Sequence, residues 1–320
     1  MAEKTGIILP AEMATREAYG LALRELGRRR DKIVVLDADL SQSTHTALFA
    51  AEFPLRFFNL GIAEADMIGT AAGLAANGYV PFASTFGVFA TGRVYDQIRN
   101  SVAYTRLNVK IAASHTGLTV GEDGASHQTL EDIALMRVLP NMTVVVPADA
   151  RQTFLAVEAV ANYEGPVYLR LGRPKIPRAV PPEMPFELGK AQVLREGSAL
   201  LLVATGIMVG RALQAAAMLD REGLQAAVLN MHTIKPLDED LLIAMARKTG
   251  AVVTAEEHSI IGGLGGAVAE VLAENCPRPL VRVGVKDTFG ESGSPEALLQ
   301  KYGLTAEDIA AAGKKALRKK

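Results

Sequence analysis

The sequence is poor in several residue types that would point to a particular environment. It has no tryptophan, and Cys276 is the single cysteine among its 320 residues. One cysteine excludes a disulfide within the chain and fits a reducing compartment. The 34 basic and 35 acidic side chains nearly cancel, for a net charge of −1. Composition therefore does not indicate nucleic acid or an anionic membrane as a partner.

Long apolar runs are also missing. No stretch approaches the roughly 20 apolar residues that would span a bilayer. The first residues, Met1 to Thr5, lack the basic region and the apolar run of a signal peptide. We therefore expect a soluble protein of the cytoplasm.

The remaining sequence alternates short β-rich runs with helical patterns, which predicts an α/β fold. Its length suffices for two domains, each with its own core. Five prolines between positions 174 and 185 disfavour both a helix and a central strand. We predict two doubly wound α/β domains, at residues 1–175 and 189–320, joined by a Pro-rich linker at residues 176–188.

The most unusual stretch is a predicted helix that begins near Glu64 and consists largely of small residues. Ala65, Gly69 and Gly73 are spaced to share one face, which lets another backbone approach closely. Two effects act on Glu64 in opposite directions. The helix N-terminus favours the carboxylate by roughly 0.3–1 kcal/mol, whereas burial in an apolar contact favours the neutral acid. Glu64 is either a proton donor in a dry contact or a carboxylate that only favours the helix dipole.

Two further segments follow predicted strands, where open α/β sheets bind ligands. A helix expected from residue 85 towards residue 104 places Phe86 and Phe89 on one face, either as core residues or as a platform for a flat heterocycle. The loop at residues 114–128 holds three glycines and two of the five histidines, His115 and His127. Long loops inside compact domains are usually functional. This one could contribute to a zinc site, or to a polar pocket in which histidines donate to substrate oxygens or move protons.

Taken together, these segments resemble the transketolase family of thiamine-diphosphate enzymes. His115, Asp123 and His127 form the pattern His-x7-Asp-x3-His inside Gly-Glu-Asp-Gly-x-x-His-Gln, which is a transketolase pattern. The small-residue helix is similar to the family's cofactor-activating segment. The resemblance implies a pyrimidine-binding domain at residues 1–175, a transketolase C-terminal domain at residues 189–320, and thiamine diphosphate as the cofactor.

The resemblance also implies a role for each matched residue. Glu64 would hydrogen-bond the aminopyrimidine ring of the cofactor and shift it to its imino tautomer, and His127 would assist proton transfer at the reacting centre. The implied cofactor contacts are Glu64, Phe86, Phe89 and Asp39. The implied substrate contacts, which hold the hydroxyls and the phosphate of a sugar, are Arg16, Ser43, His115, Asp123, His127 and Arg170.

The metal-binding motif of the family is missing. In transketolases, Gly-Asp-Gly followed later by Asn holds the divalent metal, and residues 121–124, Gly-Glu-Asp-Gly, are not that motif. A diphosphate without a metal or a positive nest is poorly neutralised. The resemblance covers essentially the whole chain but only the second half or so of a full-length transketolase. We therefore expect no metal ligand here, and a separate N-terminal-half subunit that holds the diphosphate with Mg²⁺ or Ca²⁺ in an α2β2 heterotetramer.

The resulting prediction is a subunit of a split transketolase of the pentose phosphate pathway. With its partner it would transfer a two-carbon ketol unit from a ketose phosphate to an aldose phosphate. The alternatives are a β-subunit of a 2-oxoacid dehydrogenase-type thiamine enzyme and a non-catalytic partner that retains the fold. The glycines at residues 262–266 lack the full spacing of a dinucleotide site, and we assign no catalytic residue to the second half.

Overall fold

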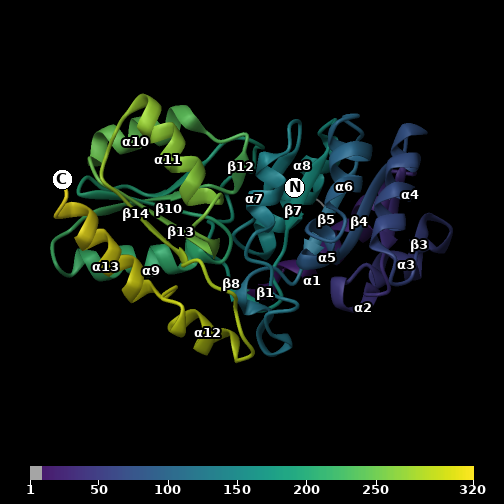
Figure 1. Cartoon of the computed structure of the whole chain (residues 1–320), viewed down its shortest axis with the longest axis horizontal. Helices are drawn as coiled ribbons and strands as arrows, with labels where there is room; N and C mark the ends of the chain where they lie inside the picture. Colours follow the sequence, from purple (N-terminus) through teal and green to yellow (C-terminus); the bar gives the residue numbers. More distant parts are fainter. Residues whose placement is uncertain (1–8) are drawn as a thin grey trace.

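The computed structural model describes residues 9–320, which form two α/β units, each around its own sheet. In Figure 1 the first unit runs from purple to teal and the second from green to yellow, and the two sheets lie side by side. The predicted fold class, two α/β domains with parallel sheets, is confirmed.

The first sheet has seven strands in the order β12-β6-β7-β5-β4-β2-β3. Its strands are β2 (Ile33–Asp37), β3 (Phe57–Asn59), β4 (Val80–Phe86), β5 (Lys110–Ser114), β6 (Thr143–Val145), β7 (Val167–Arg170) and β12 (Thr233–Lys235). All neighbours are parallel except β12, which is antiparallel to β6. β2 and β5 are buried along their whole length, as expected for parallel strands that are covered on both faces.

Helices cover both faces of this sheet. They are α1 (Thr15–Arg29), α2 (Ser41–Thr44), α3 (Ala47–Glu52), α4 (Glu64–Ala76), α5 (Gly87–Thr91), α6 (Tyr95–Gln97), α7 (Asp132–Val138) and α8 (Ala150–Asn162), with short helical turns at Pro54–Arg56, Ile98–Ala103 and Leu118–Asp123. α1 and α8 share one apolar cluster, in which Leu26 and Val157 are buried. α4 and α7 belong to the cluster that holds Met67 and Met136.

The helix predicted from residue 85 to residue 104 is wrong in its extent. β4 continues to Phe86, and the helical segment that follows is broken into α5, α6 and the turn at Ile98–Ala103. The break has a packing cause. Val94, with φ −120° and ψ 22°, leaves the helical region, and its side chain is fully buried.

The second sheet has the order β14-β13-β10-β11-β9, with β9 antiparallel to β11 and the other neighbours parallel. Its elements are β9 (Gln192–Arg195), β10 (Leu200–Ala204), α9 (Met208–Asp220), β11 (Ala226–Asn230), α10 (Glu239–Thr249), β13 (Val252–Ser259), α11 (Leu264–Asn275), β14 (Leu280–Val285), α12 (Pro295–Lys301) and α13 (Ala306–Leu317). α9 and α13 share one apolar cluster. α10 and α11 pack in the cluster that also holds α4 and α7, so one core runs across both units.

The connection between the units is tied to both of them. β8 (Lys175–Pro177) pairs antiparallel with β1 (Glu12–Ala14), and residues 178–191 form no helix or strand. The second unit returns β12 to the edge of the first sheet. The boundaries at residues 175 and 189 stay a prediction. Among residues 9–320, no helix has the length and apolar character needed to cross a membrane.

Candidate functional site

Two neighbouring strands of the first sheet end at the centre of the candidate site. β4 ends at Phe86 and β5 at Ser114, and these two residues are partners in register. His115, the next residue, stacks on Phe86 with ring centroids 3.8 Å apart and planes at 24°. Phe89, in the first turn of α5, also stacks with Phe86, with ring centroids 6.0 Å apart and planes at 13°. His127 meets Phe89 edge-on at 5.5 Å. We call these residues, Phe86, Phe89, His115 and His127, the aromatic–histidine cluster.

The two histidines of this cluster differ in their surroundings. His115 is buried, and its Nδ1 lies 2.9 Å from Ser114 Oγ. Burial, then the positive charges of Arg16 and Arg173, lowers the pKa of His115 to about 3. His115 is therefore neutral near pH 7 and offers one ring N–H donor and one acceptor. His127 is only half-buried, so its ring is accessible from outside.

Glu64 is joined to the cluster through one side chain. It is the first residue of α4 and is 3% exposed. Its Oε1 accepts a hydrogen bond from Arg93 Nη1 at 2.8 Å. The Arg93 guanidinium lies over the ring of Phe89, 4.2 Å from its centroid. In this chain the buried Glu64 carboxylate is paired with the half-exposed Arg93 guanidinium. Whether Glu64 is a proton donor in a dry contact or a carboxylate that favours the helix dipole stays a prediction.

The small-residue face of α4 is open. Ala65, Gly69 and Gly73 are exposed, and a Cβ added at Gly69 or Gly73 would meet no atom within 4 Å. Two large apolar side chains before the helix, Leu55 and Ile62, are 92% and 79% exposed. Among the residues that the structure describes, therefore, nothing uses the close approach that the small residues permit.

A second group of site residues gathers around Arg16 in α1. Arg16 Nη1 donates to the Ser43 carbonyl at 2.7 Å, and its Nε donates to the Arg173 carbonyl at 3.2 Å. Arg173 also donates to the Val120 carbonyl, and its Nη1 lies 3.6 Å from Asp123 Oδ1. The structure thus links Ser43 to Arg16, Arg16 to Arg173, and Arg173 to Asp123, and the positive charges of Arg16 and Arg173 lower the pKa of His115 in the cluster.

Sequence reasoning missed two residues of this second group. Arg173 lies only three positions after the arginine that the resemblance selected, and it follows the end of β7. His45, with φ +63°, follows α2, and its backbone passes close to Gly20 of α1, where an added Cβ would lie 2.5 Å from the His45 oxygen. Burial, and then the charge of Arg16, lowers the pKa of His45. In the sequence, only the position of His45 after the polar loop at residues 39–43 indicated it as a site residue.

Arg170, a predicted substrate contact, is paired inside the protein. It is 5% exposed, and its Nε and Nη2 donate to the two carboxylate oxygens of Asp132 at 2.6 and 3.2 Å. Asp132 is fully buried and also accepts from the Tyr168 hydroxyl at 2.7 Å. Arg170 Nη2 donates further to the backbone carbonyl of Glu257 at 3.0 Å. Arg170 therefore lies inside the protein, in an ion pair with Asp132 within the first unit, and its hydrogen bond to the Glu257 carbonyl reaches the second unit.

Asp39 lies at the edge of the site. It is exposed, with φ +63°, and exchanges two hydrogen bonds of 3.1 Å with Asn59. Asn59 in turn accepts from Gly61 N–H at 3.0 Å, in the segment that leads into α4. Asp39 is thus linked to the approach of the Glu64 helix, and the structure does not bring it into contact with the aromatic–histidine cluster.

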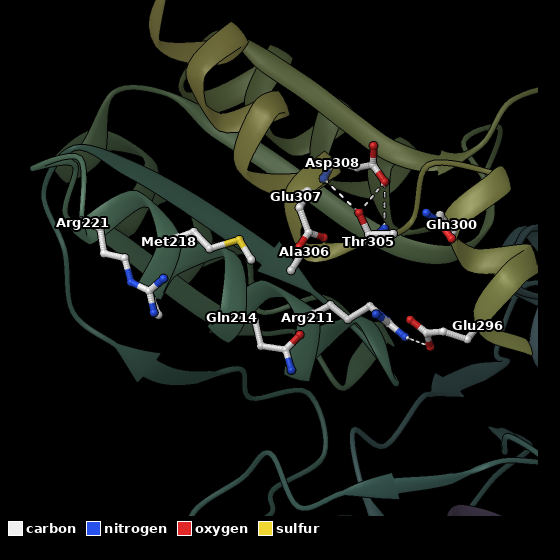
Figure 2. A pocket seen from close by; sticks show the side chains of 11 residues that line it. Arg211, Gln214, Met218, Arg221, Glu296, Gln300, Thr305, Ala306, Glu307 and Asp308 are labelled. Atoms are coloured by element: carbon white, nitrogen blue, oxygen red, sulfur yellow. Dashed lines mark hydrogen bonds and ion pairs between the residues drawn. The ribbon is translucent and has the colours of Figure 1, made fainter.

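A cavity of about 730 Å³ lies far from these residues, in the second unit. Figure 2 shows two interactions in its lining: Arg211 pairs with Glu296, at 2.7 Å, and Asp308 bonds Thr305 in the capping box of α13. We assign no ligand to it. Within residues 9–320, no three or more His, Cys, Asp or Glu side chains gather so as to hold a metal ion.

The fold and the site define a class of α/β protein: a parallel sheet whose strand ends carry an aromatic platform beside a glutamate at a helix N-terminus. Two family models match the chain. The pyrimidine binding domain of transketolase matches residues 11–178, and the transketolase C-terminal domain matches residues 189–309. The chain therefore belongs to the transketolase family.

Three relatives illustrate which part of that family it corresponds to. A solved structure described as a split gene transketolase, inactive β4 tetramer, is 60% identical, covers 96% of this chain and 99% of its own, and superposes with a TM-score of 0.90. A 6-deoxy-6-sulfo-D-fructose transketolase subunit of a Clostridium species is 48% identical over 95% of both chains. An apulose-4-phosphate transketolase subunit of Phocaeicola vulgatus is 39% identical over 93% of this chain and 95% of its own.

Transketolases depend on thiamine diphosphate, and this chain has their pyrimidine-binding domain. The chemistry of its residues fits the pyrimidine ring. Phe89 is half-buried and offers an aromatic ring for stacking, and the buried Phe86 stacks against it. The Glu64 carboxylate can bond a ring nitrogen. The described part of the chain offers no comparable set of metal ligands for the diphosphate.

Proposed function

We propose that this chain is the pyrimidine-binding subunit of a split transketolase. With an N-terminal-half partner, it transfers a two-carbon ketol unit from a ketose phosphate to an aldose phosphate. The observation that carries this proposal is the aromatic–histidine cluster. A stacking platform for the cofactor ring contacts both histidines of the transketolase loop. The Arg93 side chain, which bonds Glu64 and lies over Phe89, connects Glu64 to this platform.

We assign a separate role to each residue of the cluster and to Glu64 beside it. When bound, thiamine diphosphate supplies the nucleophilic carbon that takes up and releases the two-carbon unit. Phe86 and Phe89 orient the pyrimidine ring. Glu64 holds a proton at a ring nitrogen, and for this its carboxylate must give up the hydrogen bond with Arg93 and bond the ring instead. His127 is accessible and moves a proton at a substrate hydroxyl. His115 is neutral and buried, so it orients a hydroxyl by hydrogen bonding.

Arg16 and Arg173 are proposed to bind the anionic end of the sugar. Two of the five N–H donors of Arg16 bond backbone carbonyls, which fixes its guanidinium and leaves further donors for an anion. Two forked cations suit a tetrahedral anion. The names of two relatives support such a substrate class, since one carries a sulfo group on its sugar and the other a phosphate.

We further propose that the partner subunit holds the diphosphate with Mg²⁺ or Ca²⁺, in an α2β2 assembly in the cytoplasm. Two observations support a partner. The relative with 60% identity is described as inactive when it is a tetramer of β subunits alone. The small-residue face of α4, beside buried Glu64, is exposed in this chain and would accept the close approach of another subunit.

Reconstitution tests the proposal. The partner is recovered from the native host by pull-down with this chain, and ketol transfer is measured with thiamine diphosphate, Mg²⁺ and a panel of ketose phosphates. Glu64→Gln is expected to lower kcat by about 100-fold or more. Asp66→Asn, an exposed acid in the same helical turn, is the matched control and should stay within about twofold of the wild type. Full activity of Glu64→Gln would refute the role of Glu64, and pyruvate-dependent acyl transfer to lipoamide without ketose turnover would favour a 2-oxoacid dehydrogenase subunit instead.

A further inference from the structure

The loop that carries the site histidines is held by the second unit of the chain. Glu257, near the end of β13, accepts a hydrogen bond from the backbone N–H of Thr119 at 2.6 Å, and both residues are buried. The contact joins positions 138 residues apart. Gly117 makes room for it, since φ there is +78° and a Cβ would overlap the Glu257 carboxyl group. The first part of the loop therefore depends on a carboxylate from the C-terminal domain.

The last part of the loop is held by a second contact with the same domain. Gln128, next to His127, donates from Nε2 to the Leu118 carbonyl at 3.1 Å and to the Glu291 carbonyl at 2.9 Å. Gly124 lies against Ser292, whose Oγ would be 2.5 Å from an added Cβ. The loop is thus fixed near both of its histidines by residues of the second unit.

Glu257 is itself fixed from the first unit. Its backbone carbonyl accepts from Arg170, which is paired with Asp132 at the end of the first sheet. Burial raises the pKa of the Glu257 carboxyl, and Arg170 and the Thr119 N–H oppose this shift. In either protonation state, a carboxyl oxygen remains to accept the Thr119 N–H. The arrangement therefore keeps Glu257 in one place relative to the loop.

We propose that Glu257 is a positioning residue for the loop at residues 115–128. Through it, the C-terminal domain sets where His115 and His127 lie over the aromatic platform. This gives the C-terminal domain a part in the geometry of the active site, although it contributes no residue to the aromatic–histidine cluster. The catalytic consequence rests on the proposed function, but the contact with the loop does not.

Hydrogen–deuterium exchange of the purified chain tests the positioning without substrate or partner. In Glu257→Ala, the buried Thr119 N–H loses its acceptor, and amides of residues 117–121 should exchange about tenfold faster or more. Glu257→Gln keeps an oxygen acceptor and should stay within about threefold of the wild type. Glu256→Ala is the matched control. It removes the neighbouring buried carboxylate, which holds the N–H groups of Leu264 and Gly265 at 2.6 and 2.7 Å inside the same domain.

The comparison of these variants decides the proposal. Faster exchange of the loop in Glu257→Ala, with none in Glu256→Ala, supports it. Equal loop exchange in the two alanine variants, or wild-type exchange in Glu257→Ala, overturns it. In the reconstituted complex, Glu257→Ala should lower kcat about tenfold or more and leave half-saturation by thiamine diphosphate unchanged. If the wild-type complex shows no ketol transfer, the proposed function fails, while the exchange data still decide whether Glu257 holds the loop.

Discussion

Arg170 and Arg173 are three residues apart, yet the structure predicts that replacing them affects different properties of the protein. Arg170 is buried in an ion pair with Asp132, and Arg173 lies beside Arg16 with its side chain 34% exposed. We compare Arg170→Met with Arg173→Met, because methionine keeps most of the apolar length of arginine. Arg170→Met should lower stability, and Arg173→Met should weaken the use of the sugar phosphate.

The size of each stability loss follows from the hydrogen-bond and ion-pair partners that the substituted arginine leaves unpaired. Without Arg170, the Asp132 carboxylate keeps the Tyr168 hydroxyl but has lost two charged hydrogen bonds in a fully buried place. Although burial raises it, Arg170 and the hydrogen bonds hold the pKa of Asp132 below its ordinary value. Breaking a buried pair by removing one partner costs about 3–5 kcal/mol. Arg173 donates to the Val120 carbonyl, a hydrogen bond worth about 0.5–1.5 kcal/mol. It also pairs at 3.6 Å with the exposed acids Glu122 and Asp123, and such pairs are worth about 0–1 kcal/mol.

Two assays separate these effects. Urea unfolding, followed by circular dichroism at one protein concentration, should show a large loss of unfolding free energy for Arg170→Met and a clearly smaller one for Arg173→Met. In the reconstituted enzyme, Arg173→Met removes a charged hydrogen bond worth about 1.5–3 kcal/mol, so kcat/KM for the ketose phosphate should fall roughly 10- to 150-fold. A stable Arg170→Met protein with a strongly raised KM would refute this reasoning, since it would show that Arg170 reaches the substrate.

Two further predictions concern stability. Burial lowers the pKa of His232 to about 4 from the ordinary value of 6.5, so the unfolded chain binds a proton between these pH values that the folded chain does not. The stability that the neutral His232 contributes is therefore lost as pH falls from about 6.5 to 4. His232→Gln should lose less urea resistance between pH 7 and pH 5 than the wild type does. Equal losses would contradict this. Asp149 caps α8 through Gln152 N–H and also accepts from the N–H groups of Ala179 and Val180. Asp149→Ala should cost about 2–4 kcal/mol in urea unfolding, with Asp149→Asn in between, and a loss below about 0.5 kcal/mol would show that the linker anchor is unimportant.

Local patterns were sufficient for the fold class and for several of the contacts at the candidate site. Alternating β-rich and helical segments predict the two α/β units, and the first residue of α4 is Glu64, as the small-residue pattern indicates. Phe86 and Phe89 were expected on one face of a helix. They do stack, although Phe86 ends β4 and only Phe89 is in a helix, and the loop histidines contact them. These features depend on residues close in sequence or on strand ends that meet at one edge, and both can be read from spacing.

Features that depend on contacts between distant residues could not be predicted in the same way. Arg170 ends a strand, as ligand-binding residues of open α/β sheets do, and its sequence does not reveal that Asp132, 38 residues earlier, encloses it. β12 pairs with β6 across the two units, although its three residues carry no signal of their own. The pairing of Glu64 with Arg93 likewise joins residues 29 positions apart.

The glycines of the histidine loop were nevertheless a usable signal. Gly117, Gly121 and Gly124 all have φ near +80°, and each faces an atom of the C-terminal domain: the Glu257 carboxyl, Pro295 and Ser292, respectively. A side chain at any of them would be strained and would also meet the second domain. Three such positions in one loop therefore indicate that the loop is shaped against another part of the protein. This is why the C-terminal domain, which carries no residue of the aromatic–histidine cluster, is expected to influence that cluster's geometry.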